Sequence, residues 1–299
     1  MCRCGGVERA IDAVMQEVSE YVKHKYKSDR VKLVRYPGGD YHIFSDLNKV
    51  FTRAPGVKTF VEVFGGSCWC SLNASRVKFK VIVCNDIDSD LINLYRAIRN
   101  NPDELIKRLS MWPLSRELYE IAVEIINDKG IDDITKSVAL FYAIRTSFSG
   151  FLTSKSSFSY SKVSNHTHSY SSAVASIAEY AKKFRDVVLE CRDFREVIKL
   201  YDSDATLFYL DPPYVATSDA HNRGGYYRYS FRPIDLKTMA RVLRNIKGKW
   251  VLKIAKDNYE LIKSDLPKHS VVELEEAIRM TKIEGEERPL HTLVLAFNY

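Results

Sequence analysis

Short apolar runs alternate with amphipathic stretches along most of this chain. The runs predict buried strands, and they lie near Thr59, Val81, Val188, Phe208, Val251, Val272 and Leu293. Apolar residues at helical spacing predict helices between them, over 88–100, 115–127, 132–147, 172–185, 234–245 and 258–265. Strands that alternate with helices predict an α/β sheet.

The two ends of the chain add to this picture. Apolar residues at helical spacing over 7–26 predict an extra helix packed on the core. The last two predicted strands lie on either side of a polar stretch over 281–288, so they could form a terminal hairpin. A chain of 299 residues can bury one substantial core with a smaller appended unit.

Composition and charge narrow the class of protein. The apolar fraction of 45% is ordinary for a globular protein, so disorder is not expected. The formal net charge of +7 suits a polyanionic partner, although simple solubility explains it equally well. No apolar run approaches the length that spans a bilayer, and the start lacks the hydrophobic core of a signal peptide. We therefore expect a cytoplasmic protein that does not bind membranes.

The cysteines give a further expectation. Cys68, Cys70, Cys84 and Cys191 lie in or beside predicted strands, where free buried thiols are common. The Cys-x-Cys pairs lack the Cys-x-x-Cys spacing of zinc sites. This pattern predicts free thiols, a reducing compartment and no structural metal.

The tetrapeptide Asp211-Pro212-Pro213-Tyr214 directly follows the apolar run over 205–210. Two prolines fix two φ angles and remove two N–H donors, and the residue before a proline is pushed toward an extended conformation. The stiff turn fixes where the Asp211 carboxylate, the Pro212 carbonyl and the Tyr214 ring point. These groups can hold a flat base that bears an exocyclic amine. The alternative is a rigid turn with a surface tyrosine.

A second set of chemical groups lies upstream. Gly65-Gly66-Ser67 follows a predicted strand, and Asp86 follows the next strand about twenty residues later. This arrangement binds ribose hydroxyls in doubly wound folds. The alternative is that Asp86 or Asp88 is only the N-cap of the next helix.

Two polar segments are candidates for contact with nucleic acid. The serine-rich stretch over 151–171 contains scattered aromatic residues and lysines, which suits groove contacts, although a linker has similar composition. The segment over 223–232 contains glycines and arginines that could hold phosphates on either side of an extruded base, although an exposed loop would look the same.

In chain order, these motifs resemble the series found in adenine-N6-specific DNA methyltransferases of the Dam type. The resemblance rests on the segments 36–39, 62–67, 86–91, 193–194 and 211–214. It implies a mostly parallel seven-stranded Rossmann-like sheet with one antiparallel strand. It implies site-specific transfer of a methyl group from S-adenosylmethionine to adenine N6 in DNA. The implied domains are an N-terminal helical extension over 1–33, a catalytic domain over 34–144 and 186–299, and a target-recognition insert over 145–185.

The resemblance also implies roles for single residues. Asp86 would bind the cofactor ribose, Ile87 would pack on its adenine, and Asp193 would accept from its adenine amine. The implied catalytic residues are Asp211, Pro212, Pro213 and Tyr214. The implied cofactor-binding residues are Tyr36, Pro37, Gly38, Gly39, Glu62, Phe64, Gly65, Gly66, Ser67, Asp86, Ile87, Asp193 and Phe194. The implied DNA-binding residues are Arg145, Ser149, Lys155, Lys162, Arg223 and Arg228.

Two departures from the family pattern concern the cofactor region. The family usually has lysine where Asp40 stands and a second glycine where Cys68 stands. Both departures bear on cofactor affinity more than on fold. Two alternatives therefore stay open: a methyltransferase for RNA adenine or another amine or amide, and a catalytically weak DNA-binding relative.

The implied partner is double-stranded DNA with a flipped adenine, bound by a monomer or weak dimer. The resemblance leaves open whether a cognate restriction endonuclease accompanies the enzyme.

Overall fold

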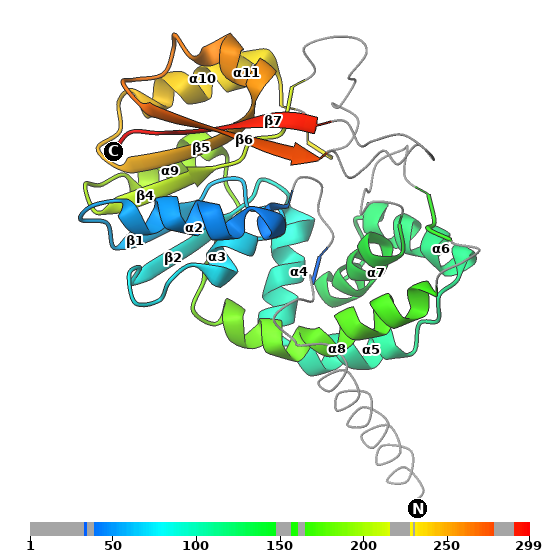
Figure 1. Cartoon of the computed structure of the whole chain (residues 1–299). Helices are drawn as coiled ribbons and strands as arrows, with labels where there is room; N and C mark the ends of the chain where they lie inside the picture. The colour runs from blue at the N-terminus through cyan, green and yellow to red at the C-terminus, as the bar shows by residue number, and fades with distance from the viewer. Residues whose placement is uncertain are drawn as a thin grey trace, which may run out of the picture.

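A computed structural model describes residues 33–34, 39–147, 157–160, 165–215, 228–229, 231–277 and 290–299 (Figure 1). The predicted helix over 7–26 lies outside these ranges. So do the predicted site residues Tyr36, Pro37, Gly38, Ser149, Lys155, Lys162 and Arg223.

A seven-stranded sheet forms the centre of the fold, with strand order β3-β2-β1-β4-β5-β7-β6. β7 is antiparallel to β5 and β6, and the other neighbouring pairs are parallel. The strands are β1 Thr59–Glu62, β2 Val81–Asn85, β3 Val188–Glu190, β4 Thr206–Leu210, β5 Lys249–Ala255, β6 Ser270–Ala277 and β7 Leu290–Phe297. The predicted sheet, its antiparallel strand and the pairing of the last two strands are confirmed.

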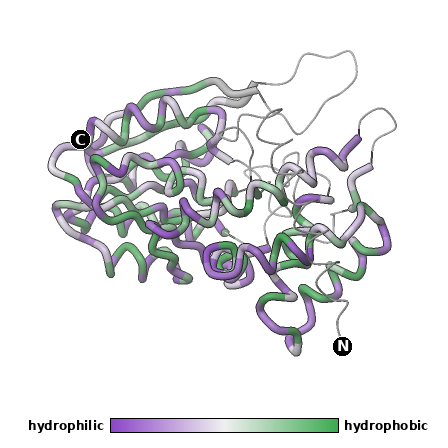
Figure 2. Tube along the Cα trace, turned by 90° about the horizontal axis from the view of Figure 1, so that it is seen from below, coloured by the Kyte–Doolittle hydropathy of each residue, from purple (hydrophilic) through white to green (hydrophobic). Residues whose placement is uncertain are grey.

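Helices surround the sheet, and hydrophilic and hydrophobic residues alternate along them, as amphipathic surface helices require (Figure 2). The helices are α2 Phe44–Arg53, α3 Trp69–Asn73, α4 Ser89–Asn100, α5 Pro102–Ser110, α6 Arg116–Asn127, α7 Asp133–Thr146, α8 His166–Phe184, α9 Phe194–Tyr201, α10 Pro233–Leu243 and α11 Lys256–Ile262, with a 3-10 turn, η2, over Asp40–His42. No helix in the described part of the chain is long and apolar enough to cross a membrane.

Sequence patterns missed α2, α3, α5 and α9. α2 buries Leu47 and Phe51, and Phe44 and Val50 also pack against the core, so a readable helical spacing was overlooked. α5 carries a recognisable start signal, because Pro102 occupies its first turn, where a missing N–H costs little. α9 begins directly after Asp193, which caps it.

Helix α8 starts at His166, six residues before its predicted start at 172. The Asn165 side chain accepts from the Thr167 backbone N–H at 2.9 Å and caps the helix. α8 packs against α4 and α5, where its residue Phe184 stacks on Tyr95 with ring centroids 4.9 Å apart. Figure 1 shows α5, α6, α7 and α8 gathered beyond α4 at one side of the sheet. The second half of the predicted insert is therefore part of a packed helical layer.

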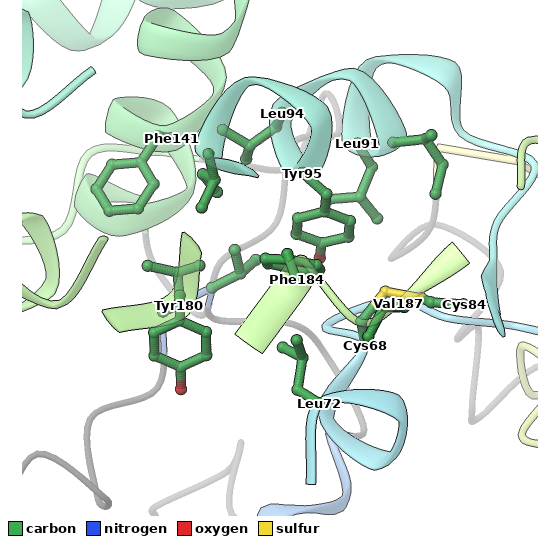
Figure 3. Close-up of a cluster of buried hydrophobic side chains, with 14 of the residues drawn as sticks. Cys68, Leu72, Cys84, Leu91, Leu94, Tyr95, Phe141, Tyr180, Phe184 and Val187 are labelled. Atoms are coloured by element: carbon green, nitrogen blue, oxygen red, sulfur yellow. A yellow bond between two sulfur atoms is a disulfide. The ribbon is translucent and has the colours of Figure 1, made fainter. Parts of the chain in front are cut away.

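The prediction of free cysteines is wrong for one pair. Cys68 and Cys84 are joined by a disulfide, with Cα atoms 5.9 Å apart (Figure 3). The cause is tertiary: the loop after β1 folds back against the end of β2, which local spacing does not reveal. Cys70 and Cys191 are free, as predicted.

Candidate active site

The sheet reverses its winding at β1, which lies between β2 and β4. The chain runs from β1 outward to β2 and β3, and from β4 outward to β5. Ligands of open α/β sheets bind at the carboxyl ends of the strands at such a switch point. Glu62, at the end of β1, pairs with Cys84 on one side and Tyr209 on the other. Asp86 and Asp211 each follow these partners by two residues, so they flank the loop after β1.

The loop after β1 is held against the end of β2. The Gly65 N–H donates to the Asn85 carbonyl at 2.6 Å, and the Gly66 N–H donates to Asp86 Oδ2 at 2.8 Å. Gly66 adopts a left-handed conformation with φ of 47°, which glycine tolerates best. The Tyr95 hydroxyl donates to the Gly66 carbonyl. These bonds leave one defined path for the backbone past the sheet edge.

Position 65 leaves no room for a side chain. A Cβ atom there would lie 2.5 Å from Cys84 Sγ and 2.8 Å from the Asn85 carbonyl oxygen. We predict that Gly65→Ala lowers the free energy of unfolding by about 2–4 kcal/mol, since backbone must shift. Gly130→Ala is the matched control. A Cβ atom at Gly130 would lie no closer than 3.3 Å to another group, and that group is the end of the Asp128 side chain, which can move. Urea denaturation of both variants measures the effect, and equal stability of the two would contradict it.

Asp86 organises this edge of the sheet. Its Oδ1 accepts from the Asp88 N–H at 2.9 Å, and burial raises the pKa of its carboxyl to about 6. Asp88, not Asp86, caps α4: its side chain accepts from the backbone N–H groups of Asp90 and Leu91. Between the two acids, residue Ile87 is 48% exposed. An exposed aliphatic side chain beside a buried carboxylate suits a ligand with a flat ring and hydroxyl groups.

Glu62 lies below the surface of the site. Its carboxylate accepts from the backbone N–H groups of Cys70 at 3.3 Å and Ser71 at 2.7 Å, in the first turns of α3. Burial raises the pKa of Glu62 to about 8, despite the hydrogen bonds from Ser71. Glu62 therefore positions the helix that follows the glycine loop.

Because the pKa of Glu62 is raised, the free energy of unfolding should depend on pH. Between its ordinary value of 4.5 and about 8, the folded state binds a proton that the unfolded state does not. Stability from this group is therefore present at low pH and falls as pH rises through this range. We predict that Glu62→Gln gains stability relative to wild type between pH 6 and pH 9. Urea titrations at both pH values measure this difference, and a pH-independent difference would contradict it.

The Asp211-Pro212-Pro213-Tyr214 corner begins where β4 ends, at the same edge. The Asp211 side chain is 17% exposed, and its Oδ2 lies 2.7 Å from Lys253 Nζ of β5. Beyond the corner, the Val215 N–H donates to Asn258 Oδ1, and the Asn258 amide donates to the Val215 carbonyl, both at 2.8 Å. The rigid corner is thus fixed at both ends.

Lys253 and Asn258 were not found from the sequence. The available signal for Lys253 was a lone lysine within the apolar run Trp250-Val-Leu-Lys-Ile-Ala255. Lys253 also contacts Asp40, with Nζ 2.5 Å from Oδ1. Burial lowers the pKa of Lys253, but Asp211 and Asp40 outweigh burial and raise it well above its ordinary value.

Asp40 lies close to Glu62 and Cys70, and single ligand atoms of the three lie within 4.8 Å of one another. Such a group could hold a metal ion by composition. Its atoms already serve other partners, however. Asp40 Oδ2 accepts from the Tyr209 hydroxyl at 2.8 Å and from Cys70 Sγ at 3.3 Å. The arrangement fits an ammonium site better than a metal site.

The remaining predicted cofactor residues fall into two groups. Gly39 and Ser67 line one cavity together with Leu33, Val34, Tyr41, Trp69 and Tyr180. Phe64 and Phe194 pack together with ring centroids 5.8 Å apart, and Phe231 joins them. The structure therefore brings one residue from each glycine motif, Gly39 and Ser67, to one cavity. The two aromatic residues form a separate wall.

The Asp193 carboxylate follows β3 and faces Arg195. It accepts from the Arg195 backbone N–H at 2.9 Å and from its guanidinium at 2.7 and 2.9 Å. The Arg195 side chain holds the pKa of Asp193 below its ordinary value. Acceptance from a cofactor amine would therefore share this carboxylate with Arg195.

The two described residues with predicted DNA contacts are engaged within the protein. Arg145 is buried, and its guanidinium donates to the carbonyl of Ser169 at 2.8 Å and to its hydroxyl at 3.0 Å. This burial argues against a direct DNA contact. Arg228 lies 3.1 Å from Asp88 Oδ2 and 2.7 Å from Asp90 Oδ2. It ties the segment after the corner to the start of α4.

Comparisons with known proteins point to the same family as the motifs at this site. The family model for the D12 class N6 adenine-specific DNA methyltransferase matches residues 36–282. The chain is 22% identical to "Type II methyltransferase M.MjaIII" of Methanocaldococcus jannaschii over 243 residues, which cover 76% of this chain and 84% of the relative. It is 25% identical to "Type II methyltransferase M1.LlaDCHI" of Lactococcus lactis subsp. cremoris over 249 residues, which cover 80% and 86%. With the sheet, the glycine loop and the Asp211 corner in their expected places, the chain belongs to the D12 class of N6 adenine-specific DNA methyltransferases.

Proposed function

We propose that this protein transfers a methyl group from S-adenosylmethionine to adenine N6 at specific sites in duplex DNA. The observation that carries the proposal is the position of the Asp211 corner. It leaves β4 next to β1, and the glycine loop held by Asp86 leaves β1 at the same edge. The Asp211 corner, which can accept hydrogen bonds from an amine, thus lies beside a loop suited to a nucleoside cofactor.

The chemistry required of the protein is mainly positional. Adenine N6 is a poor nucleophile, since its lone pair is delocalised into the ring. Acceptance of its two N–H hydrogens by Asp211 and the Pro212 carbonyl would localise the lone pair on nitrogen. A carboxylate offers about four acceptor sites, so a bond from Lys253 is compatible with one from the substrate. Methylated nitrogen is cationic and loses its proton readily, so no strong base is needed.

The target base must leave the duplex to reach this corner. Extrusion costs a few kcal/mol, and stacking of the base on an aromatic ring is worth about 1–3 kcal/mol. Tyr214, which is half-buried at the corner, would provide that ring. The stiff prolines keep the ring and the two acceptors in one geometry, which is where the rate gain arises.

The residues at the loop fit S-adenosylmethionine. Asp86 would bind the ribose, Ile87 would cover the adenine ring, and Asp193 would accept from the adenine amine. The cavity at Gly39 and Ser67 would hold the methionine end. When bound, the cofactor supplies an electrophilic methyl group on a sulfonium. Asp86, Ile87 and Asp193 would hold it in place.

DNA contacts are proposed for the chain between α7 and α8 and for the segment after the corner. The positive net charge supports a polyanionic partner. The two relatives are named Type II methyltransferases, which supports a site-specific enzyme that works beside a cognate restriction endonuclease. We propose that it acts as a monomer or weak dimer.

A single assay separates this function from its alternatives. Purified protein is incubated with deuterium-labelled S-adenosylmethionine and either adenine-unmethylated bacteriophage DNA or structured RNA. Nucleoside mass spectrometry then identifies the product. We expect labelled N6-methyldeoxyadenosine from DNA only. Labelled product from RNA alone would favour the RNA enzyme, and no product together with no cofactor binding in calorimetry would favour a binding-only relative.

A further inference from the structure

Lys253 occupies a position that normally excludes lysine. It lies within β5, in a run of buried residues, and only 2% of its side chain is exposed. A charge of this kind costs several kcal/mol to bury unless it is paired and hydrogen-bonded. The ammonium group of Lys253 must therefore be paired inside the protein.

The ammonium of Lys253 bridges two carboxylates. Its Nζ lies 2.5 Å from Asp40 Oδ1 and 2.7 Å from Asp211 Oδ2. Behind it, Asp40 is fixed by bonds from the Tyr209 hydroxyl and Cys70 Sγ. Asp40 is held in η2, Tyr209 in β4 and Cys70 in α3, so three separate elements determine where the ammonium sits.

The two carboxylates differ in access to solvent. Only 6% of the Asp40 side chain is exposed, against 17% for Asp211. The network therefore has an inner end, Asp40, and an outer end, Asp211. Because Lys253 contacts both carboxylates, the position of Asp40 fixes the ammonium group, and the ammonium group in turn fixes Asp211.

The departure at Asp40 gains a physical meaning from this network. The family usually carries a lysine where this chain carries Asp40, and here an ammonium group reaches the same place from β5. In this chain the positive charge beside Asp40 and Asp211 is supplied by β5. The acid at position 40 compensates for the lysine at position 253.

We propose that Lys253 is a positioning residue, which orients the Asp211 carboxylate so that it receives adenine N6. The proposal rests on the proposed function above. A charge-assisted bond to Oδ2 fixes the rotation of the carboxyl group, and the following prolines fix its backbone. The other oxygen then faces the substrate in one geometry.

The test compares four variants of the full-length protein in methyl transfer to unmethylated bacteriophage DNA. Lys253→Met removes the ammonium group. Asp40→Asn with Lys253→Met removes the charges of both residues, so the net charge of the network is the same as in wild type. Asp40→Lys with Lys253→Met moves the ammonium group to position 40. Lys256→Met is the matched control, because Lys256 is exposed and pairs with Glu273 at 2.9 Å.

We expect Lys253→Met to lower kcat by about 30- to 100-fold, with Kd values for cofactor and DNA within about threefold of wild type. Asp40→Asn with Lys253→Met regains thermal stability and stays slow. Asp40→Lys with Lys253→Met regains at least about tenfold of the lost kcat. Lys256→Met behaves as wild type.

Three results overturn the role of Lys253. They are a wild-type kcat in Lys253→Met, a kcat that recovers with stability in Asp40→Asn with Lys253→Met, and a folded relocation variant without recovery. A wild-type protein that methylates no DNA instead overturns the proposed function itself.

Discussion

Replacing Asp211 by alanine lowers kcat for methyl transfer by at least about a thousandfold, the upper range for loss of one positioned polar group in an active site. The substitution removes one of the two acceptors for the N6 hydrogens and leaves the lone pair delocalised. Lys253 keeps its bond to Asp40 at 2.5 Å, so the interior stays paired and the fold persists. The measurement is single-turnover transfer of labelled methyl to unmethylated bacteriophage DNA.

Binding assays separate chemistry from assembly in this variant. Kd values for S-adenosylmethionine and for DNA should stay within about threefold of wild type, because Asp211 contributes mainly in the transition state. Asp211→Asn retains one acceptor and should fall between alanine and wild type. Near-normal turnover of Asp211→Ala would refute the proposed chemistry.

Replacing Asp86 by alanine should weaken S-adenosylmethionine binding by at least about a hundredfold. The side chain accepts from the Gly66 N–H at 2.8 Å and from the Asp88 N–H at 2.9 Å, and hydrogen bonds to charged groups are each worth about 1.5–3 kcal/mol. Without these bonds the glycine loop is no longer held against β2, and the carboxylate proposed to bind the cofactor ribose is also missing. Isothermal calorimetry with the cofactor measures the change.

Asp90→Ala is the matched control for Asp86. Asp90 lies four residues on and carries the same charge, but it pairs with Arg228 at 2.7 Å and is partly exposed. We expect its cofactor affinity to stay within about threefold of wild type. Asp86→Asn keeps the side-chain volume and tests whether lost affinity follows from misfolding. Cofactor affinity of Asp86→Ala equal to that of Asp90→Ala would contradict the assignment.

Much of the sheet could be predicted because buried strands appear in the sequence as short unbroken apolar runs. β4 is buried along its whole length, which produces the unbroken run Thr206-Leu-Phe-Tyr-Leu210. The Asp211 corner was predictable for a related reason. Two consecutive prolines constrain the chain whatever surrounds them.

The rest depends on contacts between distant segments. The Lys253 ammonium joins Asp40 and Asp211, which lie 213 and 42 positions away in the chain, and no local pattern encodes such a bridge. The Cys68–Cys84 disulfide likewise forms because the glycine loop folds onto β2. The family resemblance implied a DNA contact for Arg145, and only the packing of α8 revealed that its side chain is buried.

In the proposed reaction, the rigid Asp211 corner holds the exocyclic amine of an extruded adenine. A crystal structure of the protein with a target-site duplex and an S-adenosylmethionine analogue that lacks a transferable methyl group tests it directly. We expect an adenine outside the helix, with N6 within about 3.2 Å of both an Asp211 carboxylate oxygen and the Pro212 carbonyl oxygen. A complex in which every adenine stays stacked, or in which the extruded amine lies away from Asp211, would contradict it.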